Sequence, residues 1–388
     1  ENYNFSEVMT VFLAVMVTDV VVLDMFNTLG MPTSTTVSLV FELLGGTFIL
    51  AVIKIAGDPT LTFNDLLNSD KALSVIIAIF VSVGVAFFFG IIVQWISRLI
   101  FTFNYKSHLR YTVAIFGGIA FTVLAYFIFI QGVGQSPYIS GASKIWIAQN
   151  TKMLMFFIFL GSTVVMEFLH LLRVNVFKLV VLMGTFALAM AFAGNDLVNF
   201  IGVPLAGLDS YQEFIAHGAG NDTGFMMTSL MESAKTPPLY LFLAGMIMII
   251  AMATSKKAHN VIKTSVDLSR QDEGDQMFGS SHAARSIVRA TQDFGSNVSN
   301  LIPAPVAAWV DKRFKKEDAV LEDGAAFDVI RAAVNLVLAA MLITFGTNYK
   351  LPLSTTYVTF MVAMGSSLAD RAWTRESAVF RVTGVLSV

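Results

Sequence analysis

The chain has 388 residues, of which 55% are hydrophobic and 13% are charged, and its formal net charge is −2. Soluble domains usually carry about 25% charged residues, so this composition excludes an ordinary soluble globular protein. It also gives no basic surface of the kind that binds nucleic acid. Because about 20 apolar residues span a bilayer as a helix, the long apolar runs predict an all-α, polytopic integral membrane protein.

Hydropathy predicts nine membrane-spanning helices. In chain order they are Val8–Leu29, Ser34–Ile55, Leu73–Ile96, Tyr111–Ile130, Met153–Leu172, Leu179–Phe200, Leu239–Ala253, Ile330–Phe345 and Ser354–Ala369. A further apolar start, Val379–Val388, stops abruptly and is interpreted as a truncated helix. The first residues lack the basic region of a signal peptide. The first predicted span follows at once, so we expect the chain to begin in mid-fold.

Basic residues are concentrated in alternate loops between these spans. Arg98, for example, is assigned to the loop after the third span, and ten Lys and Arg residues fall in the hydrophilic segment Ser255–Asp328. The positive-inside rule therefore predicts that this segment is cytoplasmic in a bacterial inner membrane. Within it, Asn300–Phe314 pairs apolar with basic residues. A helix on the membrane surface and a solvated linker explain that pattern equally well.

Two short segments of the chain resemble each other. Pro32–Thr36 (PTSTT) has Gly45 thirteen positions after its proline, and Pro352–Thr356 (PLSTT) has Gly365 at the same spacing. Each follows a short break that contains glycine and asparagine, and each precedes an apolar run. The loop orientation puts the two prolines on opposite sides of the membrane. The pair therefore predicts an inverted-topology repeat with broken or re-entrant helices.

The repeated segments have the chemistry of a site for phosphate or sulfate. Proline in the first turn of a helix loses no hydrogen bond, and hydroxyl groups there join unpaired N–H groups at the positive end of the helix dipole. Ordinary N-capping explains one such segment, but two copies with matched spacing favour a shared anion site. The candidate substrate-binding residues are Ser34, Thr35, Thr36, Ser354, Thr355 and Thr356.

A second candidate site consists of Asn195, Asp196 and Asn199, which lie within an apolar run. An ionisable residue at membrane depth is costly and indicates a functional site by default. The two asparagines share a helix face, and Gly194 and Gly202 permit either a break in the helix or a close approach of backbone. Carboxylate and amide oxygens suit a hard cation such as Na⁺. Alternatively, Asp196 carries a proton or is satisfied by a neighbouring helix.

Three further polar residues, Asp24, Asn27 and Glu42, are secondary candidates. Asp24 and Asn27 can share a face of the first helix, where they either line the transport pathway or lie near its end. Glu42 lies eight residues after Ser34. Lining of the pathway and packing between helices are equally good interpretations of Glu42.

With these motifs the chain resembles the inorganic phosphate transporter family. Gly194–Asn199 (GNDLVN) is similar to the Asn-Asp motif of that family in its second-half copy. Leu351–Thr356 and Met31–Thr36 are similar to the two copies of its Pro-Ser-Thr motif. No counterpart of the first-half Asn-Asp motif precedes Asp19. We therefore expect the chain to lack the N-terminal segment of the family.

The resemblance implies secondary active transport of inorganic phosphate by alternating access, in symport with Na⁺ or H⁺. It implies a transporter rather than an enzyme, with no cofactor besides the coupling ion. Its partners would be phosphate, the cation and the lipid bilayer, and a homodimer is compatible with it. The alternatives are a permease for sulfate or another tetrahedral oxyanion and, from a different class, an anion channel.

The expected parts of the chain follow from the spans and the repeats. They are the remainder of the first inverted repeat (1–56), connecting transmembrane helices (57–178), the first part of the second repeat (179–254), a cytoplasmic loop (255–328) and the last part of the second repeat (329–388).

Overall fold

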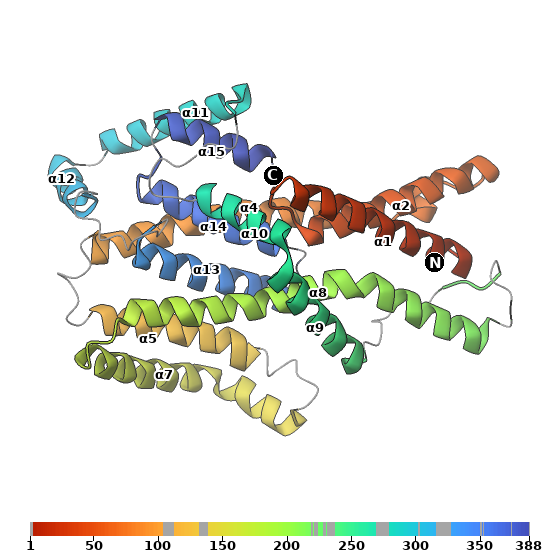
Figure 1. Cartoon of the computed structure of the whole chain (residues 1–388), viewed down its shortest axis with the longest axis horizontal. Coiled ribbons are helices and arrows are strands. Elements are labelled where there is room, and N and C mark those ends of the chain that lie inside the picture. The colour runs from red at the N-terminus through yellow and green to blue at the C-terminus, as the bar shows by residue number, and fades with distance from the viewer. Residues whose placement is uncertain are drawn as a thin grey trace. The chain divides into compact units, whose positions relative to one another are not determined.

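The computed structural model describes residues 3–103, 112–131, 139–218, 220, 224–227, 230, 237–268, 279–301, 303–315, 327–349, 351, 353–373 and 375–387. Over these ranges it confirms an all-α membrane protein, with seven helices long and apolar enough to cross a bilayer (Figure 1). They are α1 (Phe5–Thr28), α2 (Thr35–Gly57), α4 (Ser69–Phe101), α5 (Thr112–Ala125) continued by the π-helix η2 (Tyr126–Gln131), α7 (Gly141–Leu171), α8 (Val176–His217) and α13 (Val329–Asn348).

The predicted count of nine spans is too high for this part of the chain. The segment expected at Leu239–Ala253 forms α9 (Pro238–Thr254), which bends by 73° into α10 (Lys256–Leu268) and makes one broken span or a re-entrant loop. The segment expected at Ser354–Ala369 forms α14 (Thr355–Ala369), with 15 residues. Because a helix rises about 1.5 Å per residue, α14 is shorter than the roughly 30 Å hydrocarbon core. The remaining helices are α3 (Phe63–Leu66), α11 (His282–Leu301), α12 (Ala304–Arg313) and α15 (Arg375–Ser387).

α8 is one helix of 42 residues that runs through both Gly194 and Gly202. The break that these glycines permit is therefore not present in α8. Glycine disfavours a helix by about 1 kcal/mol relative to alanine, which the long apolar flanks of α8 outweigh. Pro204 also lies inside the helix.

The described residues divide into two compact units, each assembled from separate stretches of the chain. Unit 1 is Glu1–Ser82, Phe192–Ile262 and Leu351–Thr356. Unit 2 is Val83–Ala191, Lys263–Lys350 and Tyr357–Val388. The sequential parts expected from hydropathy describe membrane topology and stay a prediction.

In unit 1, α1 and α2 lie side by side (Figure 1). Val11 and Val15 of α1 form a buried cluster with Val203 of α8, and Leu39 and Leu43 of α2 pack against it. The outward side chains of these helices are apolar as well: Leu13 is 63% exposed and Ile53 is 62% exposed. Such exposure is unfavourable in water but natural in lipid, which supports the membrane assignment.

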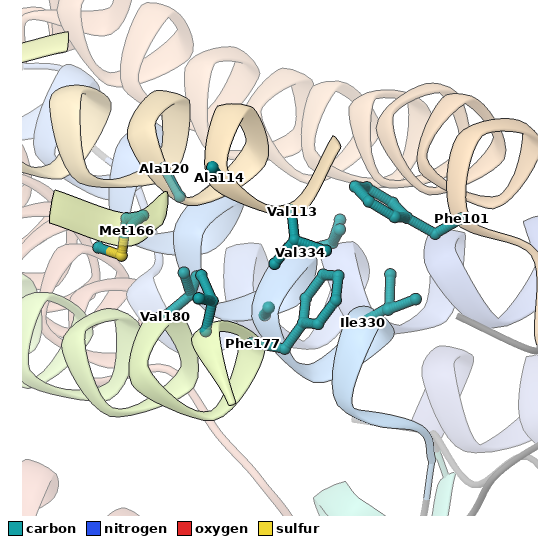
Figure 2. Close-up of a cluster of buried hydrophobic side chains, with 11 residues drawn as sticks. Phe101, Val113, Ala114, Ala120, Met166, Phe177, Val180, Ile330 and Val334 are labelled. Atoms are coloured by element: carbon teal, nitrogen blue, oxygen red, sulfur yellow. The ribbon is translucent and has the colours of Figure 1, made fainter. Parts of the chain in front are cut away.

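In unit 2, a core of aromatic and aliphatic side chains joins α4, α5, α7, α8 and α13 (Figure 2). Phe101 meets Phe177 edge-to-face, with ring centroids 5.2 Å apart, and this geometry adds to the burial of apolar area. A Cβ atom added at Gly118 of α5 would overlap Thr163 of α7. A small residue therefore lets these two neighbouring helices approach closely, as is common in membrane proteins.

Unit 2 also contains a buried ion cluster, which we define as Arg98, Asp328, Asp370 and Gln94. Nη2 of Arg98 lies 2.6 Å from both Asp328 Oδ2 and Asp370 Oδ2, and all three side chains are at most 1% exposed. Gln94 Nε2 donates to Asp370 at 3.0 Å. Arg98 lies in the last turn of α4. Its predicted position in a loop is therefore wrong. The alkyl part of the Arg98 side chain continues the apolar pattern of α4, and its charge is paired with Asp328 and Asp370.

Candidate functional site

The N-terminus of α2 places three hydroxyl side chains next to one another. Ser34 is the N-cap residue, and its Oγ accepts a hydrogen bond from the Val37 N–H at 3.1 Å. Thr35 and Thr36 form the first turn. Pro32 precedes the cap and is not helical, so the predicted proline in the first turn is wrong. The hydroxyl oxygen of Ser34 caps the helix, as the N-capping interpretation expected.

The N-terminus of α14 repeats this arrangement. Ser354 directly precedes the helix and is 0% exposed, and Thr355, the first helical residue, is 2% exposed. Thr356 is partly exposed. Pro352, the proline of this copy, lies outside the described residues. Both copies thus begin a helix at the second residue of the Ser-Thr-Thr run.

α8 presents two amide groups to the start of α2. Asn199 Nδ2 donates to Thr36 Oγ1 at 2.8 Å and to Thr35 Oγ1 at 3.1 Å. Asn195 Nδ2 donates to the same Thr36 oxygen at 3.3 Å. Both asparagines reach one hydroxyl because residues four apart lie on the same helix face, which confirms the expected shared face.

Asp196 is the centre at which the three helices meet. Its Oδ1 accepts hydrogen bonds from Thr355 Oγ1 at 2.8 Å, Thr35 Oγ1 at 3.3 Å and Asn195 Nδ2 at 3.4 Å. We name Thr35, Thr36, Asn195, Asp196, Asn199 and Thr355 the Asp196 cluster, and all six belong to unit 1. The sequence interpretation separated an anion site from a cation site, and the structure joins members of both in one hydrogen-bonded group.

The electrostatics of this cluster suit charged ligands of both signs. The three donors to Asp196 Oδ1 are two hydroxyls and one amide, all neutral, so they orient the carboxylate without cancelling its charge. Carboxylate, hydroxyl and amide oxygens are ligands of hard cations. The N-termini of α2 and α14 contribute positive dipole ends, which favour an anion. Among the described residues, no group of three or more His, Cys, Asp or Glu side chains forms a metal site.

The secondary candidates have contacts of their own. Asp24 forms an exposed ion pair with Lys257 at 2.6 Å. The backbone carbonyl oxygen of Asn27 accepts a hydrogen bond from the Gly30 N–H, where α1 ends. Ser38 Oγ donates to Glu42 Oε1 at 2.6 Å, and both residues line a cavity of about 460 Å³ between α1 and α2. These contacts give Asp24, Asn27 and Glu42 partners other than the Asp196 cluster.

Sequence reasoning missed the buried ion cluster of unit 2, although a signal for it exists. Arg98 ends one apolar run, Asp328 precedes another and Asp370 ends a third. Such charges at span ends look like ordinary loop residues. Only the meeting of the three helix ends shows that Arg98 is paired with both carboxylates.

Comparison with known proteins gives one family and one solved structure. The model of the phosphate transporter family matches residues 1–266, which include Thr35, Thr36 and the motif on α8. A solved structure described as "The sodium-dependent phosphate transporter" is similar, with a TM-score of 0.57 and 13% identity over 99% of this chain and 81% of the other. At that identity the likeness shows a shared fold. No curated protein matches the sequence.

The family match covers well over half of the chain and includes both α8 asparagines and Asp196. It agrees with the helical membrane architecture and with a site built from hydroxyl, amide and carboxylate groups. It also excludes the interpretation of the chain as an enzyme. The chain belongs to the phosphate transporter family.

Proposed function

We propose that the protein is a secondary transporter that carries inorganic phosphate together with Na⁺, and that the Asp196 cluster is the site of coupling. One observation carries this proposal. A carboxylate at membrane depth accepts hydrogen bonds from Thr35 and Thr355, which begin the two helices of the repeat. A cation site and an anion site thus share the same side chains.

The cation would bind at the Asp196 carboxylate. In the described structure Asn195 and Asn199 use their Nδ2 atoms as donors to threonine hydroxyls, which leaves the amide Oδ1 atoms as cation ligands. Together with Asp196 they supply the oxygen ligands that a hard cation requires. The description of the similar solved structure as sodium-dependent supports Na⁺.

Phosphate would bind at the starts of α2 and α14, through backbone N–H groups and the hydroxyls of Ser34, Thr35, Thr36, Ser354, Thr355 and Thr356. The carboxylate of Asp196 lies within hydrogen-bond distance of Thr35 and Thr355 and therefore repels an anion there. A bound cation removes this repulsion. Cation and phosphate would consequently bind together, and alternating access would carry both across the membrane.

Two alternatives share this site. A proton on Asp196 would neutralise the carboxylate as Na⁺ does, and sulfate has nearly the shape of phosphate. We also propose that 255–328 is cytoplasmic in a bacterial inner membrane, because its basic residues follow the positive-inside rule. A homodimer remains compatible with this function.

Uptake of labelled phosphate by the reconstituted protein tests the proposal. We expect saturable uptake that follows an inward Na⁺ gradient at two pH values and persists in excess sulfate. Uptake that follows only the pH gradient would assign H⁺ as the coupling ion. Inhibition by sulfate, with sulfate uptake, would change the substrate. Flux that does not saturate and ignores both gradients would contradict a carrier and favour a channel.

A further inference from the structure

The buried ion cluster of unit 2 marks one end of the membrane spans. Arg98 lies in the last turn of α4, and Asp328 is the N-cap residue of α13. Both helices are long and apolar enough to cross the bilayer. Asp370, which directly follows α14, meets Arg98 at 2.6 Å. The ends of three helices therefore coincide, and this level lies near one membrane boundary.

The next residue, Arg371, fixes α12 at the same level. Its Nη2 lies 2.7 Å from Asp311 Oδ1 of α12. Its guanidinium also lies 5.1 Å from the ring centroid of Phe314, which is 5% exposed. An ion pair and a cation–π contact thus join the C-terminal part of α12 to the end of the spans.

Another side of α12 carries exposed apolar residues. Val306 and Trp309 lie three positions apart, which places them on the same side of a helix, and they are 49% and 48% exposed. Arg313 lies over the indole of Trp309, 5.4 Å from its ring centroid. An indole with one apolar body and one polar N–H is the side chain that membrane interfaces enrich.

Most of the charged residues between Ala304 and Lys315 are basic. Lys312, Arg313 and Lys315 follow Trp309, and the single acidic residue between Ala304 and Lys315, Asp311, is paired with Arg371. Exposed apolar side chains beside several basic residues match a bilayer surface that carries anionic headgroups.

We infer that α12 lies on the bilayer surface as an interfacial anchor. Val306 and Trp309 enter the boundary between headgroups and acyl chains, and Lys312, Arg313 and Lys315 contact the phosphates of anionic phospholipids. The contacts of Arg371 place the helix where this is possible. The inference is independent of the transported substrate, and it favours the surface helix over the solvated linker for Asn300–Phe314.

The absence of cysteine from the chain gives a direct test. Trp309→Cys and, as a matched control on another exposed side of α12, Ala308→Cys each take one environment-sensitive fluorophore. The labelled proteins are reconstituted in vesicles of phosphatidylcholine, with or without phosphatidylglycerol, that contain brominated lipid. We expect the brominated lipid to quench the label at 309 strongly and the label at 308 weakly. The difference should be larger with phosphatidylglycerol.

A third variant tests the charge. Lys312→Gln/Arg313→Gln/Lys315→Gln in the Trp309→Cys background should remove the effect of phosphatidylglycerol while quenching by brominated lipid remains. Equal quenching at 308 and 309, with both labels reached by aqueous iodide, would overturn the inference. A label at 309 that is shielded from both lipid and iodide would also overturn it, because a protein partner would then cover α12. Unchanged circular dichroism and an unchanged elution volume in size-exclusion chromatography show that the variants are folded.

Discussion

Thr355 donates a 2.8 Å hydrogen bond to Asp196 Oδ1, although 159 residues separate the two in the chain. Thr35, which holds the equivalent position in the other copy of the repeat, donates to the same oxygen at 3.3 Å. The two copies of the Pro-Ser-Thr motif therefore place corresponding hydroxyls on one carboxylate. A role in helix capping alone would not require this convergence.

The different lengths of these two hydrogen bonds predict different effects of substitution. Thr355→Val should reduce uptake at limiting Na⁺ by about tenfold or more, because a hydrogen bond to a charged group contributes roughly 1.5–3 kcal/mol. Thr35→Val should have a smaller effect through Asp196, since its bond is longer. Thr355→Ser keeps the hydroxyl and should restore most of the activity. Initial rates in proteoliposomes measure all three, and equal rates for Thr355→Val and Thr355→Ser would contradict the role of the hydroxyl.

Replacement of the central carboxylate should separate binding from coupling. Asp196→Asn is nearly isosteric, retains an oxygen acceptor and removes the charge that repels phosphate. We expect Na⁺-driven uptake to be lost while the purified variant still binds phosphate, now without dependence on Na⁺. Equilibrium binding of labelled phosphate with and without Na⁺ measures this. Unchanged Na⁺-driven uptake would remove Asp196 from the mechanism.

Coupling of Na⁺ and phosphate through Asp196 also predicts that each ligand changes the affinity for the other. If Na⁺ raises the affinity for phosphate by some factor, phosphate must raise the affinity for Na⁺ by the same factor, typically about 5- to 150-fold. Calorimetric titrations in both orders on the wild-type protein measure the two factors. Independent affinities would show that the cation and the anion do not share the Asp196 cluster.

The buried ion cluster should be important for stability. Arg98→Ala removes the guanidinium that is paired with both buried carboxylates, Asp328 and Asp370, and breaking a buried pair in this way costs about 3–5 kcal/mol. Thermal unfolding in detergent should therefore shift to clearly lower temperature. As a control, Lys257→Ala breaks the exposed pair with Asp24, and such pairs contribute only about 0–1 kcal/mol. Similar shifts for both variants would contradict the difference in burial.

The two glycines of the repeat should respond differently to the same substitution. A Cβ atom at Gly365 of α14 would overlap the Phe87 carbonyl of α4, whereas a Cβ atom at Gly45 of α2 meets nothing within 4 Å. Gly365→Ala should lower the unfolding temperature. Gly45→Ala should leave it unchanged or raise it, because alanine favours a helix by about 1 kcal/mol. Destabilisation by Gly45→Ala alone would reverse this interpretation.

Local pattern was sufficient for some features and failed for others. The apolar runs predicted most of the spans, and the four-residue spacing of Asn195 and Asn199 predicted their shared face. Some helix ends differ from the prediction. α8 continues through Gly194 and Gly202, because glycine permits a break in a helix without requiring one. Arg98 was misplaced because its neutralising partners lie 230 and 272 residues away.

The sequence by itself determined the membrane class, the repeated Ser-Thr-Thr segments and the ionisable residue within an apolar run, because each depends on residues close together in the chain. Only the tertiary structure decided that Thr35, Thr355 and Asp196 form one cluster while Asp24 and Glu42 have other partners. The physical reason is that helix packing, driven by many weak apolar contacts along whole helices, selects which polar groups meet. Those contacts join segments far apart in the chain, and no local spacing encodes them.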